Sequence, residues 1–131
     1  MSYECPSDEK AVFNLSTLTS AYAGGLTSGD IEVRSNDKYT LICTYAGGAT
    51  ETNNTCEIEI SFGDGTNYAQ YGFWSAAATS TYTKQTFQIA QDTGAVINVE
   101  ALGRNMRIRA KETGVVTNAG SLTIYLYRNK N

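Results

Sequence analysis

Two carboxylates in this chain, Glu57 and Glu59, have a spacing that could support acid–base catalysis. In a β-strand, residues two positions apart point to the same face and lie about 7 Å apart, which overlaps the carboxylate separation of inverting glycosidases. Catalysis would also need a neighbouring apolar or charged feature that shifts a carboxyl pKa, and the sequence supplies none beside them. We therefore interpret the pair as a solvated strand face and predict no catalytic residues.

Histidine is absent from all 131 residues. Its absence removes the usual general base, the Ser-His-Asp and Cys-His arrangements and the commonest metal ligand. Asp64 and Asn67 could offer oxygens to calcium, but they fall short of the six to eight that the ion requires, and Asp64-Gly65 is typical of a hairpin turn. Three widely spaced cysteines do not complete a zinc shell. We therefore predict a non-enzymatic protein without metal or cofactor.

Three cations, Arg107, Arg109 and Lys111, alternate with apolar residues near the C-terminus. This alternation predicts a strand whose apolar side faces a core and whose cations face outward. The cations could pair with carboxylates of other strands, such as Glu57 and Glu59, each exposed pair contributing about 0–1 kcal/mol. They could equally bind an acidic partner surface, so both interpretations stay open.

Aromatic side chains provide the second set of candidate contacts. Tyr125 and Tyr127 take the outward positions of the closing strand, and Tyr71, Phe73 and Trp74 lie in one short segment. Tyrosine and tryptophan are enriched at protein interfaces. Tyr71 and Trp74 could alternatively stack on sugars, whereas Phe73 is expected in the core.

The pattern of strands and turns predicts an all-β protein. We expect an antiparallel two-sheet sandwich, jelly-roll-like, of about eight strands. Residues 1–10 are expected to form an N-terminal arm and residues 11–131 a single domain. The expected strands cover residues 11–18, 31–34, 39–45, 56–62, 68–74, 82–90, 95–102, 106–111 and 121–128.

The cysteines leave several pairings open. If the strands around Cys43 and Cys56 form a hairpin, a register that places Leu41 opposite Ile58 also places Cys43 opposite Cys56. They could then form a disulfide or remain two buried thiols. Cys5 is left as a free thiol or as an intermolecular link.

Charge and hydropathy exclude two classes of partner. A net charge of −3 argues against a general nucleic-acid-binding protein, which would be basic. No apolar run approaches the roughly 18 residues that a membrane span needs. The N-terminus has no features of a secretory signal, so we expect folding in a cytoplasm.

Several motifs resemble one group of proteins. They are an extended strand at 39–45, the loop Ala49-x-Glu-Thr-Asn-Asn54, the turn Gly63-Asp-Gly-Thr-Asn67, and Lys111-Glu-Thr-Gly114 followed by Ala119-Gly120 in an expected closing hairpin. Over residues 39–128 the chain resembles small β-sandwich proteins encoded among tailed-phage virion genes. The resemblance implies a virion context and supplies no catalytic residues.

The resemblance, taken with the expected fold, implies a phage virion structural protein. We expect an auxiliary capsid protein (a decoration or cement protein), assembled in the host cytoplasm, that stabilises the shell by binding across capsid subunits. Its partner would be the major capsid protein or another virion protein, and it would itself form an oligomer such as a trimer. The expected contacts are Tyr3, Cys5, Phe13, Arg107, Arg109, Lys111, Tyr125 and Tyr127. The alternative is a tail-associated or receptor-binding module that recognises carbohydrate through Tyr71 and Trp74.

Overall fold

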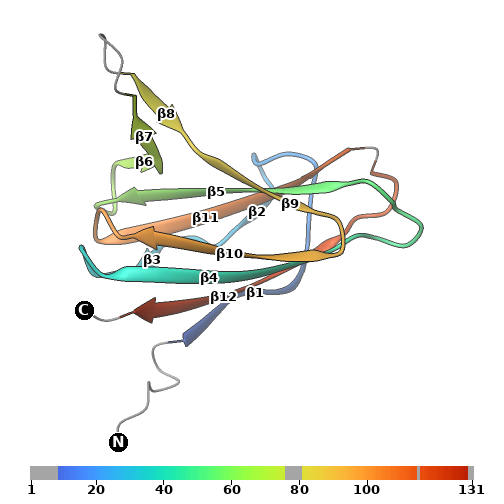
Figure 1. Ribbon diagram of the computed structural model, residues 1–131, viewed down its shortest axis with the longest axis horizontal. Helices are drawn as coiled ribbons and strands as arrows, with labels where there is room; N and C mark the ends of the chain where they lie inside the picture. The colour runs from blue at the N-terminus through green and yellow to red at the C-terminus, as the bar shows by residue number, and fades with distance from the viewer. Residues whose placement is uncertain (1–8, 76–80, 115, 130–131) are drawn as a thin grey trace, which may run out of the picture.

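The computed structural model describes residues 9–75, 81–114 and 116–129, and this part of the chain contains strands and no helix. The strands form two antiparallel sheets that pack face to face, and a small hairpin that stands away from them (Figure 1). The predicted all-β sandwich is therefore confirmed. Tyr3 and Cys5 lie outside the described residues.

Sheet A contains four strands in the order β1-β12-β4-β10. Their bounds are β1 Glu9–Thr17, β12 Ser121–Asn129, β4 Lys38–Ala46 and β10 Thr93–Glu100. Strand β1 already begins at Glu9, which pairs with Tyr127. The last two residues of the expected arm, Glu9 and Lys10, are therefore part of the sandwich.

Sheet B is built around two long strands, β5 (Thr55–Gly63) and β11 (Asn105–Thr113). Two short strands, β2 (Leu26–Thr27) and β3 (Ile31–Glu32), pair with the free side of β11. Strands β6 (Tyr68–Gln70) and β9 (Thr86–Ala90) pair with the free side of β5. Between β6 and β9, β7 (Gly72–Trp74) and β8 (Tyr82–Lys84) pair with each other in the separate hairpin.

Ten of the twelve strands occupy eight positions in the sandwich, and β7 and β8 form the separate hairpin. Strands β2 and β3 share one position beside β11, and β6 and β9 share another beside β5. After β9 the chain alternates between sheets, from β10 in sheet A to β11 in sheet B and β12 in sheet A. This is the double-sheet jelly-roll arrangement that the sequence predicts. The strand count is higher than about eight because the expected strands 68–74 and 82–90 each divide where the hairpin leaves sheet B, and because β2 forms in a segment where no strand is expected.

The expected closing hairpin is wrong. Strand β11 pairs with β5, β2 and β3, whereas β12 pairs with β1 and β4, so the two last strands lie in opposite sheets. The alternation itself is confirmed, because both strands bury their apolar side chains between the sheets. Alternation indicates which side of a strand faces the core, but it does not specify the neighbouring strand.

The core fills the space between the inner faces of the two sheets. Apolar side chains from all the long strands meet there in one cluster. Its buried side chains include Cys56, Ile58, Ile60 and Phe62 of β5, Ile97 and Val99 of β10, and Ala101 just after β10.

Cys43 and Cys56 face this core from opposite sheets, so the hairpin that would have set them side by side does not form. Both are free thiols. Burial raises the pKa of each thiol to about 12, because the interior disfavours the charged thiolate.

These two thiols are expected to resist alkylation in the folded protein. A Cys5→Ser variant should incorporate no iodoacetamide under native conditions and two equivalents after denaturation, since only the exposed thiolate reacts. Mass spectrometry measures both values. Rapid modification of the folded variant at neutral pH would show that the thiols are accessible.

Candidate functional site

The predicted cationic row lies on the outer face of sheet B, where its members already have partners. The β5–β11 register sets Arg109 opposite Glu59 and Lys111 opposite Glu57. The Arg109 Nη2 to Glu59 Oε1 distance is 2.5 Å, and the Lys111 Nζ to Glu57 Oε1 distance is 3.8 Å. The two carboxylates singled out as a catalytic candidate therefore neutralise two of the three cations.

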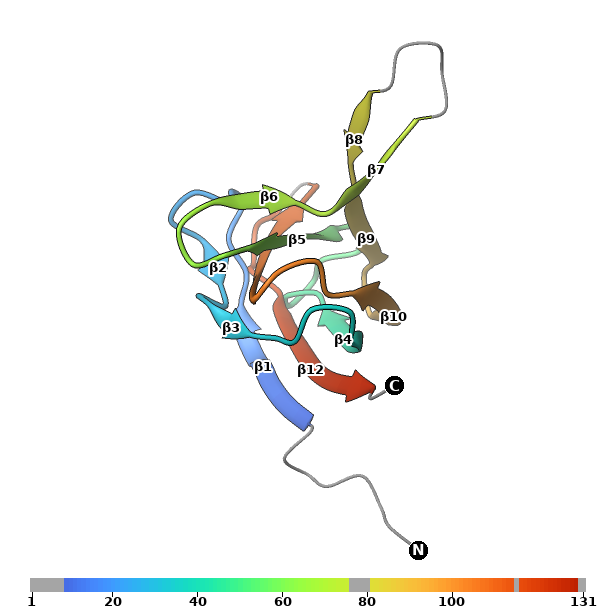
Figure 2. The ribbon, with the colours of Figure 1, turned by 90° about the vertical axis from the view of Figure 1, so that its left-hand side faces the viewer.

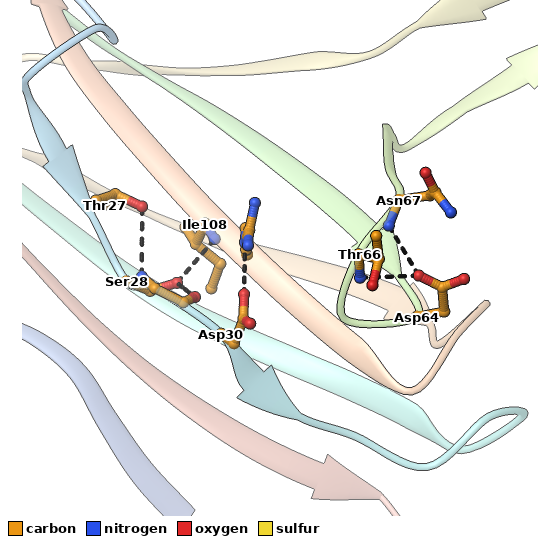
Figure 3. A network of polar contacts seen from close by, with 9 residues as sticks. Thr27, Ser28, Asp30, Asp64, Thr66, Asn67 and Ile108 are labelled. Carbon is orange, nitrogen blue, oxygen red and sulfur yellow. Dashed lines mark hydrogen bonds and ion pairs between the residues drawn. The ribbon is translucent and has the colours of Figure 1, made fainter.

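Arg107 has a partner outside this register. Its Nε donates to the carboxylate of Asp30 at 2.5 Å. Asp30 lies close to β11 in the sequence segment that hydrogen-bonds to this strand. Two residues before it, Ser28 Oγ accepts the backbone N–H of Ile108 at 2.9 Å (Figure 3). The neighbouring guanidinium lowers the pKa of Asp30, so the pair stays ionised well into the acid range.

Two tyrosines cover the same cations. The guanidinium of Arg107 lies 3.6 Å from the ring centroid of Tyr68, and Arg109 and Lys111 lie 4.8 and 4.7 Å from that of Tyr22. Each cation thus has both a carboxylate and an aromatic contact within the chain. The geometry favours internal pairing of the row over binding of an acidic partner.

The outer face of sheet A, the side turned away from sheet B, carries a different pattern. The registers of four neighbouring strands align Ala11 with Tyr125, Tyr125 with Ile42, and Ile42 with Val96. Ile42 is 43% exposed and Val96 is 63% exposed. We call these four residues the apolar row. It crosses the whole sheet on the face that also carries the predicted contact residues Tyr125 and Tyr127.

A polar row runs beside the apolar row. The Tyr127 hydroxyl donates to Glu9 at 2.9 Å, and the Thr40 hydroxyl donates to Asn98 at 2.8 Å. The bond to Glu9 raises the pKa of Tyr127. An apolar stripe bordered by hydrogen-bonded polar groups is the usual composition of a protein-binding surface.

The small β7–β8 hairpin projects from the body of the sandwich (Figures 1 and 2). Trp74 is 67% exposed, and its ring meets that of Tyr82 edge-on at 5.3 Å. Phe73 is 55% exposed, so its expected place in the core is wrong. It faces solvent because the hairpin has left the sheet whose inner face would have covered it.

Tyr71 does not join Trp74 in one platform. It is half-buried at the base of the hairpin, where its ring packs edge-on against Phe62 of the core at 5.9 Å. Trp74 instead packs against Tyr82 within the hairpin. Of the two residues expected to stack on sugar, only Trp74 presents an exposed ring.

Phe13 was expected to contact a partner, but the structure places it in the core. It is 4% exposed and lies opposite Ile124 in the β1–β12 pairing. A register shift on each side of Phe13 interrupts regular alternation in β1. Its side chain is therefore not available to a binding partner in this fold.

A buried polar cluster joins the two sheets, and the sequence analysis missed it. The Tyr45 hydroxyl of β4 donates to Glu112 Oε2 of β11 at 2.5 Å, and the Gly120 N–H donates to Glu112 Oε1 at 2.8 Å. Burial and the bond to Glu112 raise the pKa of Tyr45. Gly120 is required there, because a Cβ atom would lie 2.5 Å from Glu112 Oε2 and from the Ala46 carbonyl oxygen.

The Asp64 segment forms the predicted turn between β5 and β6 (Figure 3). Asp64 Oδ1 accepts the backbone N–H groups of Thr66 and Asn67 at 2.9 and 2.8 Å, which lowers the pKa of its carboxyl group. Gly65 supplies the positive φ of 99°. The side-chain oxygen of Asp64 thus accepts hydrogen bonds from the backbone of its own turn. No cluster of metal-ligating side chains occurs within residues 9–75, 81–114 and 116–129.

The apolar row is the candidate functional site, because it combines exposed apolar side chains with a rigid, hydrogen-bonded support. No helix in the described part of the chain is long and apolar enough to cross a membrane. Comparison with protein-family models, curated proteins and solved structures gave no match.

Proposed function

We propose that this protein is a structural component of a tailed-phage virion, acting as an auxiliary capsid protein. In this proposal it binds the major capsid protein through the outer face of sheet A and carries out no catalysis. The observation that carries the proposal is the apolar row, in which Ile42 and Val96 expose apolar surface beside Tyr125. The virion context comes from the resemblance of residues 39–128 to phage virion proteins.

The energetics of the face suit stable association. Burying apolar surface contributes roughly 25 cal/mol per Å², and the tyrosines add area with few rotatable bonds. The row lies on a sheet whose other side is packed in the core, so little conformational entropy is lost when it docks. A continuous sheet face of this kind can lie across a junction between two capsid subunits.

Binding across such a junction would stabilise the shell kinetically. Subunits held by a bridging protein must break an additional interface before they separate, which raises the barrier to opening. Copies arranged around a symmetry axis, for example as trimers, would add the contacts expected of Tyr3 and Cys5. Jelly rolls are used by viral capsid and lectin domains, so the fold is compatible with this role without deciding it.

Charge placed in the apolar row should abolish capsid binding. In an Ile42→Glu plus Val96→Glu variant, docking would bury two unpaired carboxylates, and we expect affinity to fall at least about 100-fold. The measurement is co-sedimentation with shells assembled from the major capsid protein of the same phage. The control, Thr27→Glu plus Ala90→Glu, adds the same charge to exposed positions of sheet B and should bind normally. Equal binding by the two variants would contradict the proposed interface.

The second candidate is a carbohydrate-binding module of the tail. The observation that favours it is the exposed ring of Trp74 on the projecting hairpin, since sugars stack on such rings. Binding to a glycan array that disappears in Trp74→Ala but persists in Ile42→Glu plus Val96→Glu would support this function in place of capsid binding.

A further inference from the structure

A groove of about 560 Å³ is lined by residues of β1, β3, β4 and β12 and of the loops that follow β3 and precede β11. Figure 2 shows these four strands near one another at one end of the sandwich. Its volume lies in the range of roughly 300–1,000 Å³ that is usual for ligand sites. The floor of the groove is the edge of the core, formed by Ile31, Val33 and Leu126.

Four cations surround this floor: Lys10, Arg34, Arg104 and Arg128. Lys10 is aligned with the buried Leu126, so its strand position faces the inside of the sandwich. Arg128 is likewise aligned with the buried Tyr39. The sheets therefore hold cations at inward positions where the apolar core ends, and Arg34 and Arg104 reach the same groove from loops.

The groove has a positive charge in an acidic protein. Besides the four cations, Glu32 lines the groove and Asp37 pairs with Arg128, so the local surplus is two positive charges (four minus two). The whole chain carries a net charge of −3 and contains ten Lys and Arg residues. Four of those ten at one small site is a concentration that favours an anionic ligand.

The four cations differ in how they are held. Arg128 Nε lies 2.8 Å from Asp37 Oδ2, and Arg104 Nη2 donates to the Asp64 carbonyl oxygen at 3.3 Å. For Lys10 and Arg34, by contrast, the described residues provide no ion-pair partner. The backbone of Arg34 is nevertheless fixed, because its N–H donates to the Tyr39 hydroxyl at 2.8 Å.

We infer that this groove binds a short acidic peptide segment of another protein. Carboxylates of the segment would pair with Lys10 and Arg34, and an apolar side chain between them would lie on the floor. A peptide fits better than a nucleic acid. The acidic body of the protein repels an extended polyanion, whereas a short segment meets only the basic end.

This site goes beyond the proposed capsid function. The groove lies at the end of the sandwich, between the sheets, whereas the apolar row crosses the outer face of sheet A. The two sites can therefore be tested separately, and the failure of one leaves the other standing.

The probe for the test is a fluorescein-labelled peptide, Glu-Leu-Asp-Glu-Leu-Asp, titrated with the full-length protein and followed by fluorescence anisotropy. We expect saturable binding that weakens as salt is added, since the contacts are exposed charge pairs. Lys10→Gln plus Arg34→Gln should weaken binding about tenfold. The control, Lys84→Gln plus Arg109→Gln, removes the same charges outside the groove and should change affinity less than about twofold.

Two further probes decide the class of ligand. The peptide Glu-Ser-Asp-Glu-Ser-Asp keeps the charges but cannot use the apolar floor, and it should bind several-fold more weakly. A single-stranded oligothymidine of similar charge should bind more weakly than either peptide. The inference is overturned if the acidic peptide does not bind, if both double variants bind it equally, or if the oligonucleotide binds more tightly.

Discussion

Replacement of Glu112 by alanine is expected to destabilise the protein by about 4 kcal/mol. The change leaves the Tyr45 hydroxyl and the Gly120 N–H buried without an acceptor, and each such group costs about 1–3 kcal/mol. The side chain is also almost completely buried, so its removal opens a cavity between the sheets. Urea unfolding followed by tryptophan fluorescence or circular dichroism gives the free energy.

Two control variants distinguish the loss of the buried Glu112 cluster from the removal of an ordinary surface carboxylate. Glu57→Ala removes a half-buried glutamate whose partner, Lys111, can be rehydrated, and it should cost at most about 1 kcal/mol. Tyr45→Phe removes one donor and leaves the bond to Gly120, so it should fall between the two. Equal losses for Glu112→Ala and Glu57→Ala would show that the cluster does not hold the sheets together.

Glu112 also shows what the sequence pattern can and cannot predict. In β11 the buried positions are Met106, Ile108, Ala110 and then Glu112, so the alternation already indicates that this glutamate faces inward. Beside Lys111 it is easily taken for one more surface charge. A polar residue at an inward strand position is therefore a detectable signal of a buried polar contact. Its partner Tyr45, however, lies in the other sheet and cannot be identified from spacing.

The fold class and the inward faces follow from local patterns, whereas strand neighbours do not. The hairpin considered for Cys43 and Cys56 requires that two strands adjacent in sequence pair with each other, but the jelly roll puts β4 and β5 in opposite sheets. The same difficulty affects β11 and β12. Long-range pairing depends on the whole topology, and a period of two carries no information about it.

The candidate binding surfaces could be predicted only in part, because they too depend on which strands are neighbours. Tyr125 and Tyr127 were correctly assigned to an outward face, since alternation fixes that side. Ile42 and Val96 were missed because only strand alignment brings them together with Tyr125. The basic groove gathers cations from four separate parts of the sequence, so it has no local signature at all.

Stability is expected to fall steeply with rising pH above about 9, and the buried thiols are the cause. The pKa of Cys43 and of Cys56 is raised from 9.0 to about 12 in the folded protein, chiefly by burial. Between these values the unfolded chain has lost both protons while the native state keeps them. The native state therefore binds more protons, and the free energy of unfolding decreases as pH rises.

The slope of this decrease is large. Each thiol contributes about 1.4 kcal/mol per pH unit in this window, so two thiols together cost about 5 kcal/mol between pH 9 and 11. A domain of this size has a total stability of roughly 5–15 kcal/mol, and the loss therefore brings it close to unfolding. Well below pH 9, near neutral pH, the thiols are protonated in both states, and their contribution is constant.

A comparison in the Cys5→Ser background tests whether the buried thiols cause this loss of stability, since Cys43 and Cys56 are then the only thiols. Adding Cys43→Ala and Cys56→Ala should lower stability at pH 7, because two buried sulfur atoms are lost, yet flatten the decline between pH 9 and 10. Above pH 10 the free energy of unfolding should again decrease with pH. The raised pKa of Tyr45 means that the unfolded chain loses this proton before the native state does. Urea unfolding at successive pH values supplies the curves. Parallel curves between pH 9 and 10 would exclude the thiols as the cause and would direct attention to tyrosine and lysine instead.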